Sequence, residues 1–275
     1  MKRTSLRARL LSAPYIVWAA IFIVVPLFIV VYYAFTDRSG VFSLSNITAL
    51  ADYKDTFIIS VWYSVIATVI TLVIAYPFAY ALSRFGANTQ RMMMLLVMLP
   101  MWMNLLIRTY SWMNILERNG IINNVLAGFG IEPLKMIGTP GAVILGMVYN
   151  YLPYMILPIY TVMSKLDITL LEAADDLGAN AFQRLRTLVI PLSMPGVISG
   201  ITMVFVPSVS TFYISQKLGS TGTTLIGDVI ESQFKTAYNP NLGAAMSLVL
   251  MILIFICVAV MNRFGEGDGE EVIKV

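Results

Sequence analysis

The sequence KLDITLLEAADDLGANAFQRLRTLVIP, residues 165–191, connects two apolar segments that are each long enough to span a membrane. Thr169 and Glu172 have the spacing of a capping box, which predicts that a helix begins there. Gly178 stands where a helix ends in the left-handed conformation, and Asn180 can cap a second helix. The pattern therefore predicts two short helices with a bend between them.

The apolar residues of this predicted hairpin, residues 165–187, recur at helical spacing and indicate one apolar face on each helix, that of the second helix pointing inward. The residues expected on these faces are Leu170, Leu171, Ala174, Leu177, Phe182 and Leu185. Ala173 and Ala174 are small, so we expect a flat surface that the backbone of a partner can approach closely.

The composition is that of a membrane protein. Of the 275 residues, 58% are hydrophobic and only 12% are charged, with a mean hydropathy of +0.80, whereas soluble domains carry about 25% charged residues. The single cysteine, Cys257, excludes a disulfide within the chain, and the lack of histidine removes the commonest general base and metal ligand. The net charge of +3 is spread along the chain, which argues against a nucleic-acid partner.

Six apolar segments are long enough to cross a bilayer of about 30 Å. They cover residues 14–35, 57–82, 92–113, 141–163, 188–214 and 242–261. Eleven Lys and Arg residues fall on the N-terminal side of these segments and six on the other side, so the positive-inside rule predicts cytoplasmic termini and a cytoplasmic hairpin. We therefore expect an all-α, multi-pass membrane protein that forms one transmembrane domain, residues 1–275.

The fifth segment contains residues that are unusual in a membrane helix. Pro195 and Pro207 each remove a backbone hydrogen bond, which is tolerated where a helix packs on protein or lines a water-filled path. Gly196 and Gly200 have the small-xxx-small spacing of closely packed helices. Both alternatives, a packing helix and a pathway-lining helix, are open at this point.

The apolar segments lack the groups that drive other transporters. All fifteen carboxylates lie in loops or tails, although proton- and sodium-coupled carriers commonly use ionisable or unwound sites near the membrane centre. The sequence also lacks the G-x-x-x-x-G-K-[ST] phosphate loop of an ATPase. A transport pathway without these features needs an external motor, and the hairpin is the element suited to receive it.

The hairpin resembles the EAA loop of permease subunits in binding-protein-dependent ABC importers. The matching residues are Glu172, Ala173, Ala174, Gly178, Leu188, Ile190 and Pro191, with Leu188 and Ile190 where the family favours Ile and Leu. In that family this loop is the coupling helix, which docks in a groove of a cytoplasmic ATPase. The resemblance implies that the ATPase-coupling residues are Glu172, Ala173, Ala174, Asp175, Asp176, Gly178 and Pro191.

The same resemblance implies a MetI-like permease fold in a bacterial inner (plasma) membrane. ATP and Mg²⁺ would be bound by the partner subunits, and this chain would hold no cofactor, metal or catalytic residue. The carboxylates Glu172, Asp175 and Asp176 leave a membrane-embedded enzyme open as an alternative. Because no histidine accompanies them, basic residues of the ATPase are their expected partners.

Further stretches resemble the B-type permeases of spermidine/putrescine importers along nearly the whole chain. They are residues 106–110 (LIRTY), 139–144 (TPGAVI), 152–153 (LP), 165–167 (KLD), 212–215 (FYIS) and 225–230 (LIGDVI). The resemblance implies an importer of polyamines whose further subunits are a second, C-type permease, two identical ATPases and an extracellular polyamine-binding protein. A permease for another small organic solute is the alternative.

A linear polycation needs carboxylates and aromatic faces, because both attract ammonium groups. Asp228 and Glu231 are three residues apart and share a face if that segment is helical. Phe212, Tyr213 and Tyr149 offer aromatic faces, and these five residues form the predicted substrate pathway. In the alternative interpretation, Asp228 caps a helix and the aromatic side chains anchor the chain at the membrane interface.

Arg108 is the one charged residue inside a predicted span. A buried cation would repel a polyamine, so a gate or a contact with a partner is the favoured role. The alternative is that the side chain extends to the lipid headgroups.

Overall fold

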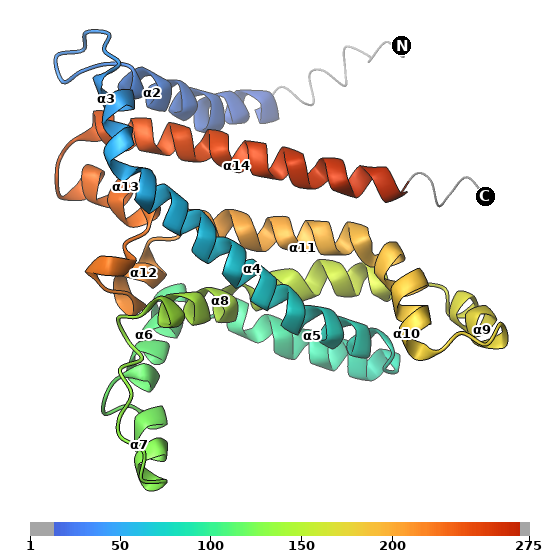
Figure 1. Ribbon diagram of the computed structural model, residues 1–275. Coiled ribbons are helices and arrows are strands. Elements are labelled where there is room, and N and C mark those ends of the chain that lie inside the picture. The colour runs from blue at the N-terminus through green and yellow to red at the C-terminus, as the bar shows by residue number, and fades with distance from the viewer. Residues whose placement is uncertain (1–13, 270–275) are drawn as a thin grey trace, which may run out of the picture. The chain divides into compact units, whose positions relative to one another are not determined.

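The computed structural model describes residues 14–269, whose regular elements are helices (Figure 1). Contacts divide the chain into two compact units. Within residues 14–269, one joins the residues up to Asp55 to Val229–Leu253, and the other joins Thr56–Asp228 to the residues from Ile254 on. The expectation of one transmembrane domain stays a prediction.

Among the described residues, five helical stretches are long and apolar enough to cross a membrane, and a bent pair of helices makes a sixth. The five are Pro14–Ala34, Ser45–Ser83, Pro140–Met163, Ala181–Ser210 and Pro240–Met261. This agrees with the predicted number of about six spans. The side of the membrane on which the termini lie stays a prediction.

The third predicted span, residues 92–113, is not one continuous helix. The chain bends by 90° between α5 (Ala87–Trp102) and α6 (Leu105–Leu116). Pro100 lies in the last turn of α5, and the side chain of Asn104 caps α6 by accepting a hydrogen bond from the amide two residues later (2.7 Å). Mean hydropathy shows only how long and how apolar a segment is. It therefore did not predict the break of the helix at Pro100 or the new helix cap at Asn104.

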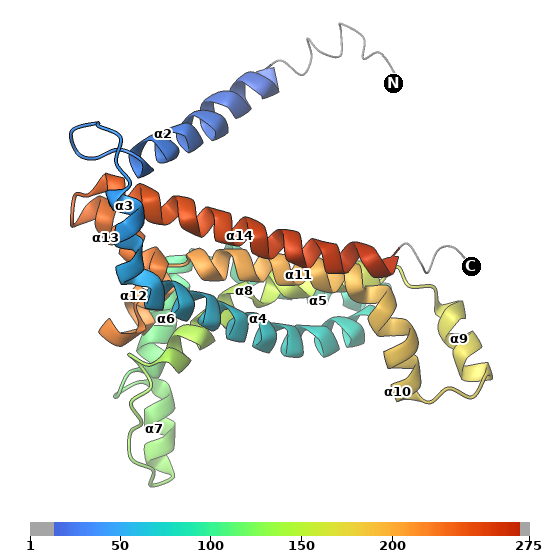
Figure 2. The same cartoon turned by 45° about the horizontal axis from the view of Figure 1, so that its top comes forward.

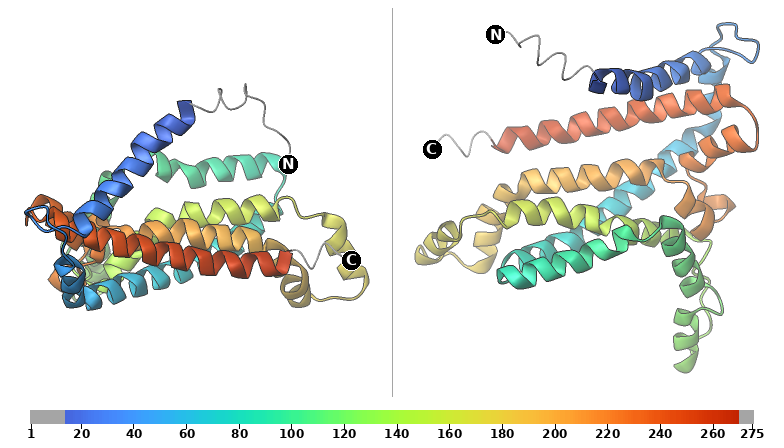
Figure 3. Two further views of the ribbon diagram at one scale, coloured as in Figure 1. Left: turned by 90° about the horizontal axis from the view of Figure 1, so that it is seen from above. Right: turned by 180° about the vertical axis from the view of Figure 1, so that it is seen from behind.

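The larger unit is built around α8 (Pro140–Met163) and α11 (Ile190–Ser210), which pack side by side (Figure 3). α4 (Lys54–Ser83) reaches them through small buried residues. The shared core contains Ala75, Ala79, Met155, Ile156, Ile159, Met163, Val189, Val197 and Val204.

Two glycines explain the close packing of α11 on α8. A β-carbon on Gly196 would lie 2.8 Å from the carbonyl oxygen of Pro158, and one on Gly200 would lie 2.7 Å from the sulfur of Met155. Both distances are too short for a side chain, so the backbones approach as the small-xxx-small spacing predicted. This supports the packing interpretation of the fifth segment.

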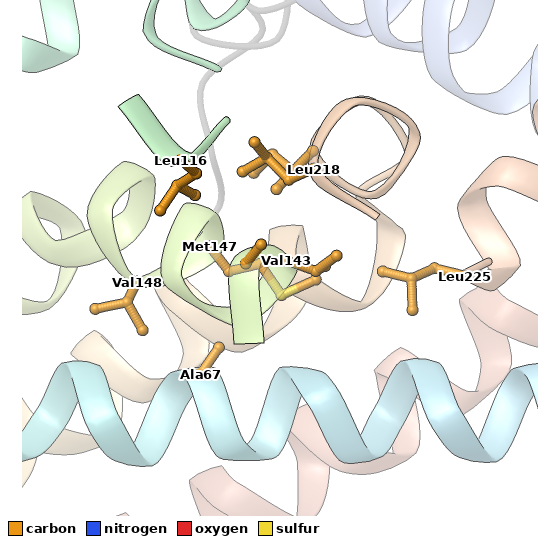
Figure 4. Close-up of a cluster of buried hydrophobic side chains, with 9 residues drawn as sticks. Ala67, Leu116, Val143, Met147, Val148, Leu218 and Leu225 are labelled. Carbon is orange, nitrogen blue, oxygen red and sulfur yellow. The ribbon is translucent and has the colours of Figure 1, made fainter. Parts of the chain in front are cut away.

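A second cluster holds α6 against α8 and α12 (Tyr213–Leu218) at the opposite end of the larger unit from α9 and α10 (Figures 1 and 4). Leu116 of α6 and Leu218 of α12 contribute to this cluster with residues of α4 and α8. The others labelled in the close-up are Ala67, Val143, Met147, Val148 and Leu225. This packing fixes the position of the helix that carries Arg108.

The smaller unit joins the first span to the start of α14 (Pro240–Gly269). The Asn241 amide donates hydrogen bonds to the carbonyl oxygens of Thr36 (2.8 Å) and Tyr33 (3.2 Å), and Ala34 packs against Ala244.

The remaining elements of the described chain are η1 (Ala20–Val24), α2 (Val25–Ala34), α3 (Ser45–Thr48), η2 (Ala49–Tyr53), α7 (Ile121–Gly128), η4 (Thr221–Thr223) and α13 (Ile226–Lys235).

Candidate functional site

The predicted hairpin is present. α9 (Ile168–Asp176) and α10 (Ala181–Arg184) extend beyond the ends of α8 and α11 (Figure 2). The π-helical turn η3 (Leu185–Val189) joins α10 to α11. Two helices with a bend are therefore confirmed, and their cytoplasmic position stays a prediction.

The first helix begins earlier than predicted. Asp167 caps α9, and its carboxylate accepts a hydrogen bond from the Thr169 N–H (3.0 Å). This bond holds the pKa of Asp167 below its usual value, so a negative charge stays at the positive end of the helix dipole. The predicted capping box of Thr169 and Glu172 was wrong, because both residues lie inside α9.

The first helix ends as predicted. Gly178 has a φ of +80°, and its N–H donates to the Asp175 carbonyl (2.9 Å) while the Ala179 N–H donates to the Ala174 carbonyl (3.0 Å). These are the two bonds of a Schellman motif. A β-carbon on Gly178 would meet nothing within 4 Å, so glycine is needed here for its backbone conformation and not for space.

The second helix carries the capping box. The Asn180 side chain accepts a hydrogen bond from the Gln183 N–H (2.8 Å), and the Gln183 side chain accepts one from the Asn180 N–H (2.8 Å). The predicted cap at Asn180 is confirmed. A Schellman motif and a capping box within a few residues make the reversal of the chain compact and rigid.

An ion pair connects the two helices of the hairpin. Arg184 Nη1 donates to Asp175 Oδ1 over 2.6 Å. Asp175 therefore has a partner within the chain. All three carboxylates of the hairpin, Glu172, Asp175 and Asp176, are exposed. Contact of Glu172 and Asp176 with an ATPase stays a prediction. No group of three or more His, Cys, Asp or Glu residues able to hold a metal is found within residues 14–269.

The hairpin exposes several apolar side chains, among them one that was expected to point inward. Leu177 is 88% exposed, Phe182 is 69% exposed and Leu170 is also exposed, whereas Leu171 and Leu185 pack on the core of the larger unit. The inward position predicted for Phe182 was wrong, because spacing shows which residues share a face and not which partner covers that face. The hairpin therefore exposes large apolar side chains together with the carboxylates of Glu172 and Asp176, and we call these residues the hairpin surface.

The other predicted coupling residues lie on or beside this surface. Ala173 is exposed and Ala174 is half-buried. Pro191 is exposed in the first turn of α11, directly after η3. Proline has no N–H for the helix ladder, and η3 is the point at which the helix departs from α geometry.

One predicted aromatic residue, Tyr213, is already engaged with a cation of the chain, together with Tyr110. The rings of Tyr110 and Tyr213 meet edge to face at 6.4 Å, and Lys217 Nζ lies 5.3 Å and 5.8 Å from their centroids. These are distances of cation–π contacts. Phe212, directly before α12, is exposed. Sequence reasoning missed Lys217, although its spacing of four residues from Tyr213 would place both on one helical face.

The two predicted acidic residues occupy different environments. Asp228 is buried, and its carboxylate accepts hydrogen bonds from the Leu225 N–H (2.8 Å) and the Ser215 hydroxyl (3.0 Å). Glu231 forms an ion pair with Lys235 over 2.7 Å. Residues 226–235 form the helix α13, so Asp228 and Glu231 can share a helical face as predicted. The hydrogen bonds of Asp228 favour the alternative interpretation, in which this residue caps a helix. Contact of either carboxylate with substrate stays a prediction.

Tyr149 lies in an apolar environment on α8. Its ring meets that of Trp112 edge to face at 5.3 Å. It also borders a pocket of about 230 Å³ between α4, α5 and α8, whose lining residues include Phe78 and Pro100. This pocket offers an aromatic wall and no carboxylate among its lining residues.

Arg108 is buried in α6 with 7% of its surface exposed. Its Nε and Nη1 atoms have no hydrogen-bond acceptor among residues 14–269. Because α6 turns away from α5 by 90°, Arg108 lies after the bend and not within a continuous span as predicted. Burial between helices also argues against extension of this side chain to lipid headgroups.

Comparison with known proteins identifies the family. Residues 77–266, more than half of the chain, match the family described as "Binding-protein-dependent transport system inner membrane component". The chain belongs to this family. It is therefore a multi-pass permease subunit of the inner membrane, as the EAA-like loop predicted.

Relatives and solved structures agree with this assignment. The chain is 38% identical to the spermidine/putrescine transport system permease protein PotB of Haemophilus influenzae, over 90% of both chains. It is 36% identical to PotB of Escherichia coli, over 90% of this chain and 93% of that protein. A bacterial ABC transporter structure for import of the acidic polysaccharide alginate matches with a TM-score of 0.77 at 16% identity, over 94% and 96% of the two chains. This structural similarity confirms the permease fold.

Proposed function

We propose that this chain is the B-type permease of an ATP-driven importer of polyamines such as spermidine and putrescine. The names of its relatives from Haemophilus influenzae and Escherichia coli support this substrate class. In the proposed transporter, this chain forms one half of the pathway and a C-type permease forms the other half. An extracellular binding protein delivers the polyamine.

The hairpin is the observation that carries the coupling part of the proposal. It presents exposed apolar side chains beside Glu172 and Asp176, and its two caps and the Asp175–Arg184 pair make it rigid. A rigid element can transmit motion from a docked subunit to α8 and α11, to which it is directly connected. Two ATPase subunits bind ATP and Mg²⁺ and carry out hydrolysis, while this chain moves with them.

Reconstitution tests the proposal. The chain is co-expressed with an ATPase, a second permease and a binding protein from its own source, and the complex is placed in liposomes with ATP on the ATPase side. We expect ATP-dependent uptake of radiolabelled spermidine, competed by putrescine. A complex that hydrolyses ATP and transports another small organic solute, but no polyamine, would contradict the substrate class.

The coupling part has a separate readout. We expect the ATPase to co-purify with the wild-type chain and to be lost when Leu177 and Phe182 are both changed to Asp, because these side chains provide exposed apolar surface of the hairpin. Retention of the ATPase by this double variant would contradict docking at the hairpin, whatever the substrate.

A further inference from the structure

A pocket of about 380 Å³ lies where the C-terminal end of α4 meets α10 (Figure 1). Its lining residues include Tyr76 and Tyr80 of α4 and Phe182 and Arg184 of α10. The two tyrosines are half-buried against the core of the larger unit, and the Tyr76 hydroxyl lies 2.9 Å from the Ser193 hydroxyl of α11. The wall of the pocket that α4 forms is therefore held in place by tertiary contacts.

The pocket lies at the level of the membrane surface. Tyr76 and Tyr80 fall in the last turns of α4, which ends a membrane-length helical stretch at Ser83. Tyrosines at the ends of spanning helices are typical of the headgroup zone, because the ring is apolar and the hydroxyl is polar. A ligand of this pocket would therefore meet the apolar part of the bilayer on one side and water on the other.

Two arginines give the pocket a positive end. Arg184 lines it, and the guanidinium of Arg84 lies 5.1 Å from the centroid of the Tyr80 ring, a cation–π distance. No Asp or Glu of the described chain is among the lining residues. Asp175 pairs with Arg184, whereas no carboxylate within residues 14–269 lies at ion-pair distance from Arg84. The pocket thus combines aromatic surface with a cation that has no counter-ion in this part of the chain.

We propose that this pocket binds an anionic phospholipid, with the lipid phosphate at Arg84 and Arg184 and the glycerol and first acyl carbons against Tyr76 and Phe182. Basic pockets between transmembrane helices bind the headgroups of anionic lipids. Guanidinium groups donate strong, often paired hydrogen bonds to phosphate oxygens. The site requires only that the chain spans a membrane, so it is independent of the polyamine and of the ATPase.

Other occupants fit this pocket less well. A polyamine carries the same charge as the two arginines and would be repelled by them. Phosphatidylcholine offers a phosphate, but its choline brings a cation toward the same end. A free phosphate ion suits the arginines and would leave the aromatic side chains Tyr76 and Phe182 uncovered.

Charge removal provides the first test. The full chain is reconstituted in nanodiscs of phosphatidylcholine with a minor fraction of phosphatidylglycerol, and the retained lipids are counted by native mass spectrometry. We expect Arg84→Gln with Arg184→Gln to lower the retained phosphatidylglycerol about tenfold. The matched control, Arg91→Gln with Arg186→Gln, removes two exposed arginines of the same end and should change it little. Equal losses in the two double variants would indicate general surface charge and overturn the proposal.

Two further variants separate lipid binding from damage to the hairpin. Arg84→Gln alone leaves the Asp175–Arg184 pair intact and should still lower the retained phosphatidylglycerol about threefold. Arg84→Lys with Arg184→Lys keeps both charges and should retain part of the lipid that the glutamine pair loses. No loss with Arg84→Gln alone, or a lysine pair as defective as the glutamine pair, would overturn the proposal.

A fluorescent label locates the lipid. Ala181 also lines the pocket, so bimane is attached to the Ala181→Cys variant of a chain whose Cys257 is changed to Ala. We expect phosphatidylglycerol with brominated acyl chains to quench this label more than equally brominated phosphatidylcholine. The same label on the Ala87→Cys variant, at an exposed position where α5 begins, should show no preference.

The label also distinguishes the other outcomes. Equal quenching by the two lipids at position 181 would show that the pocket does not select an anionic headgroup, and would overturn the proposal. Binding of inorganic phosphate to the chain in detergent, without a preference for phosphatidylglycerol in nanodiscs, would assign the pocket to a free anion and overturn it as well.

Discussion

The guanidinium of Arg184 donates to the carboxylate of Asp175 across the bend of the hairpin, with Nη1 and Oδ1 separated by 2.6 Å. The pair connects the end of α9 to α10. It therefore acts on the angle between the two helices, which determines the shape of the surface formed by Leu177 and Phe182.

Breaking this pair is expected to weaken coupling without abolishing it. The two side chains are 25% and 50% exposed, so the pair is worth about 0.2–1 kcal/mol. Asp175→Asn should lower the affinity for the ATPase about two- to fivefold, measured by titration of the purified subunits. The exchange Asp175→Arg with Arg184→Asp should recover part of the loss. Complete loss without any recovery would instead indicate that Asp175 itself contacts the ATPase.

Substitution of Gly178 is expected to damage the hairpin through the backbone. At a φ of +80°, an L-residue costs roughly 1–2 kcal/mol, with asparagine tolerated best. Gly178→Val should therefore reduce ATPase co-purification strongly, Gly178→Asn only slightly. Because no atom lies within 4 Å of an added β-carbon, equal effects of both variants would exclude backbone strain as the cause.

The glycines of α11 are expected to differ in their tolerance of alanine. The β-carbon at position 196 would meet the backbone oxygen of Pro158, whereas that at position 200 would first meet the flexible side chain of Met155. Gly196→Ala should cost about 1–3 kcal/mol as an overpacked contact, and Gly200→Ala less. The melting temperatures of the purified complexes show which substitution destabilises more. Gly128→Ala is the control, because a β-carbon added there meets no atom within 4 Å. The reverse order would contradict the packing.

Asp228 is expected to stabilise the fold. Loss of its charge leaves donors at Leu225 and Ser215 poorly satisfied, at a cost of about 1–3 kcal/mol. Asp228→Asn should lower the melting temperature of the purified complex, whereas Asp176→Asn, at an exposed carboxylate, should not. If Asp228→Asn kept its stability but lost spermidine uptake, contact with the substrate would be the better explanation.

Removal of Lys217 tests whether the polyamine passes the α6–α12 end. Its ammonium occupies the ring faces of Tyr110 and Tyr213, and one such contact is worth about 0.5–1 kcal/mol at an exposed site. If the pathway uses these rings, Lys217→Met should lower the KM for spermidine about two- to fivefold at unchanged protein amount. An unchanged KM would remove Tyr213 from the predicted pathway.

Several features of the hairpin could be predicted because they depend on neighbouring residues alone. Gly178 ends one helix and Asn180 starts the next, as expected from the conformation of glycine and the side-chain acceptor of asparagine. The number of spans also follows from local composition. The break in the third span was not predicted, because Pro100 and the helix cap at Asn104 interrupt an apolar segment without changing its hydropathy.

The sequence by itself determined a helical membrane protein with a rigid, capped hairpin between two spans, since helix caps and membrane-length apolar segments are local properties. Only the tertiary structure decided that Leu177 and Phe182 point outward, that Asp228 is buried and that Lys217 covers two tyrosine rings. It also decided that Arg108 is buried without an acceptor in the described chain. These outcomes depend on which helices meet, and helix periodicity carries no information about that.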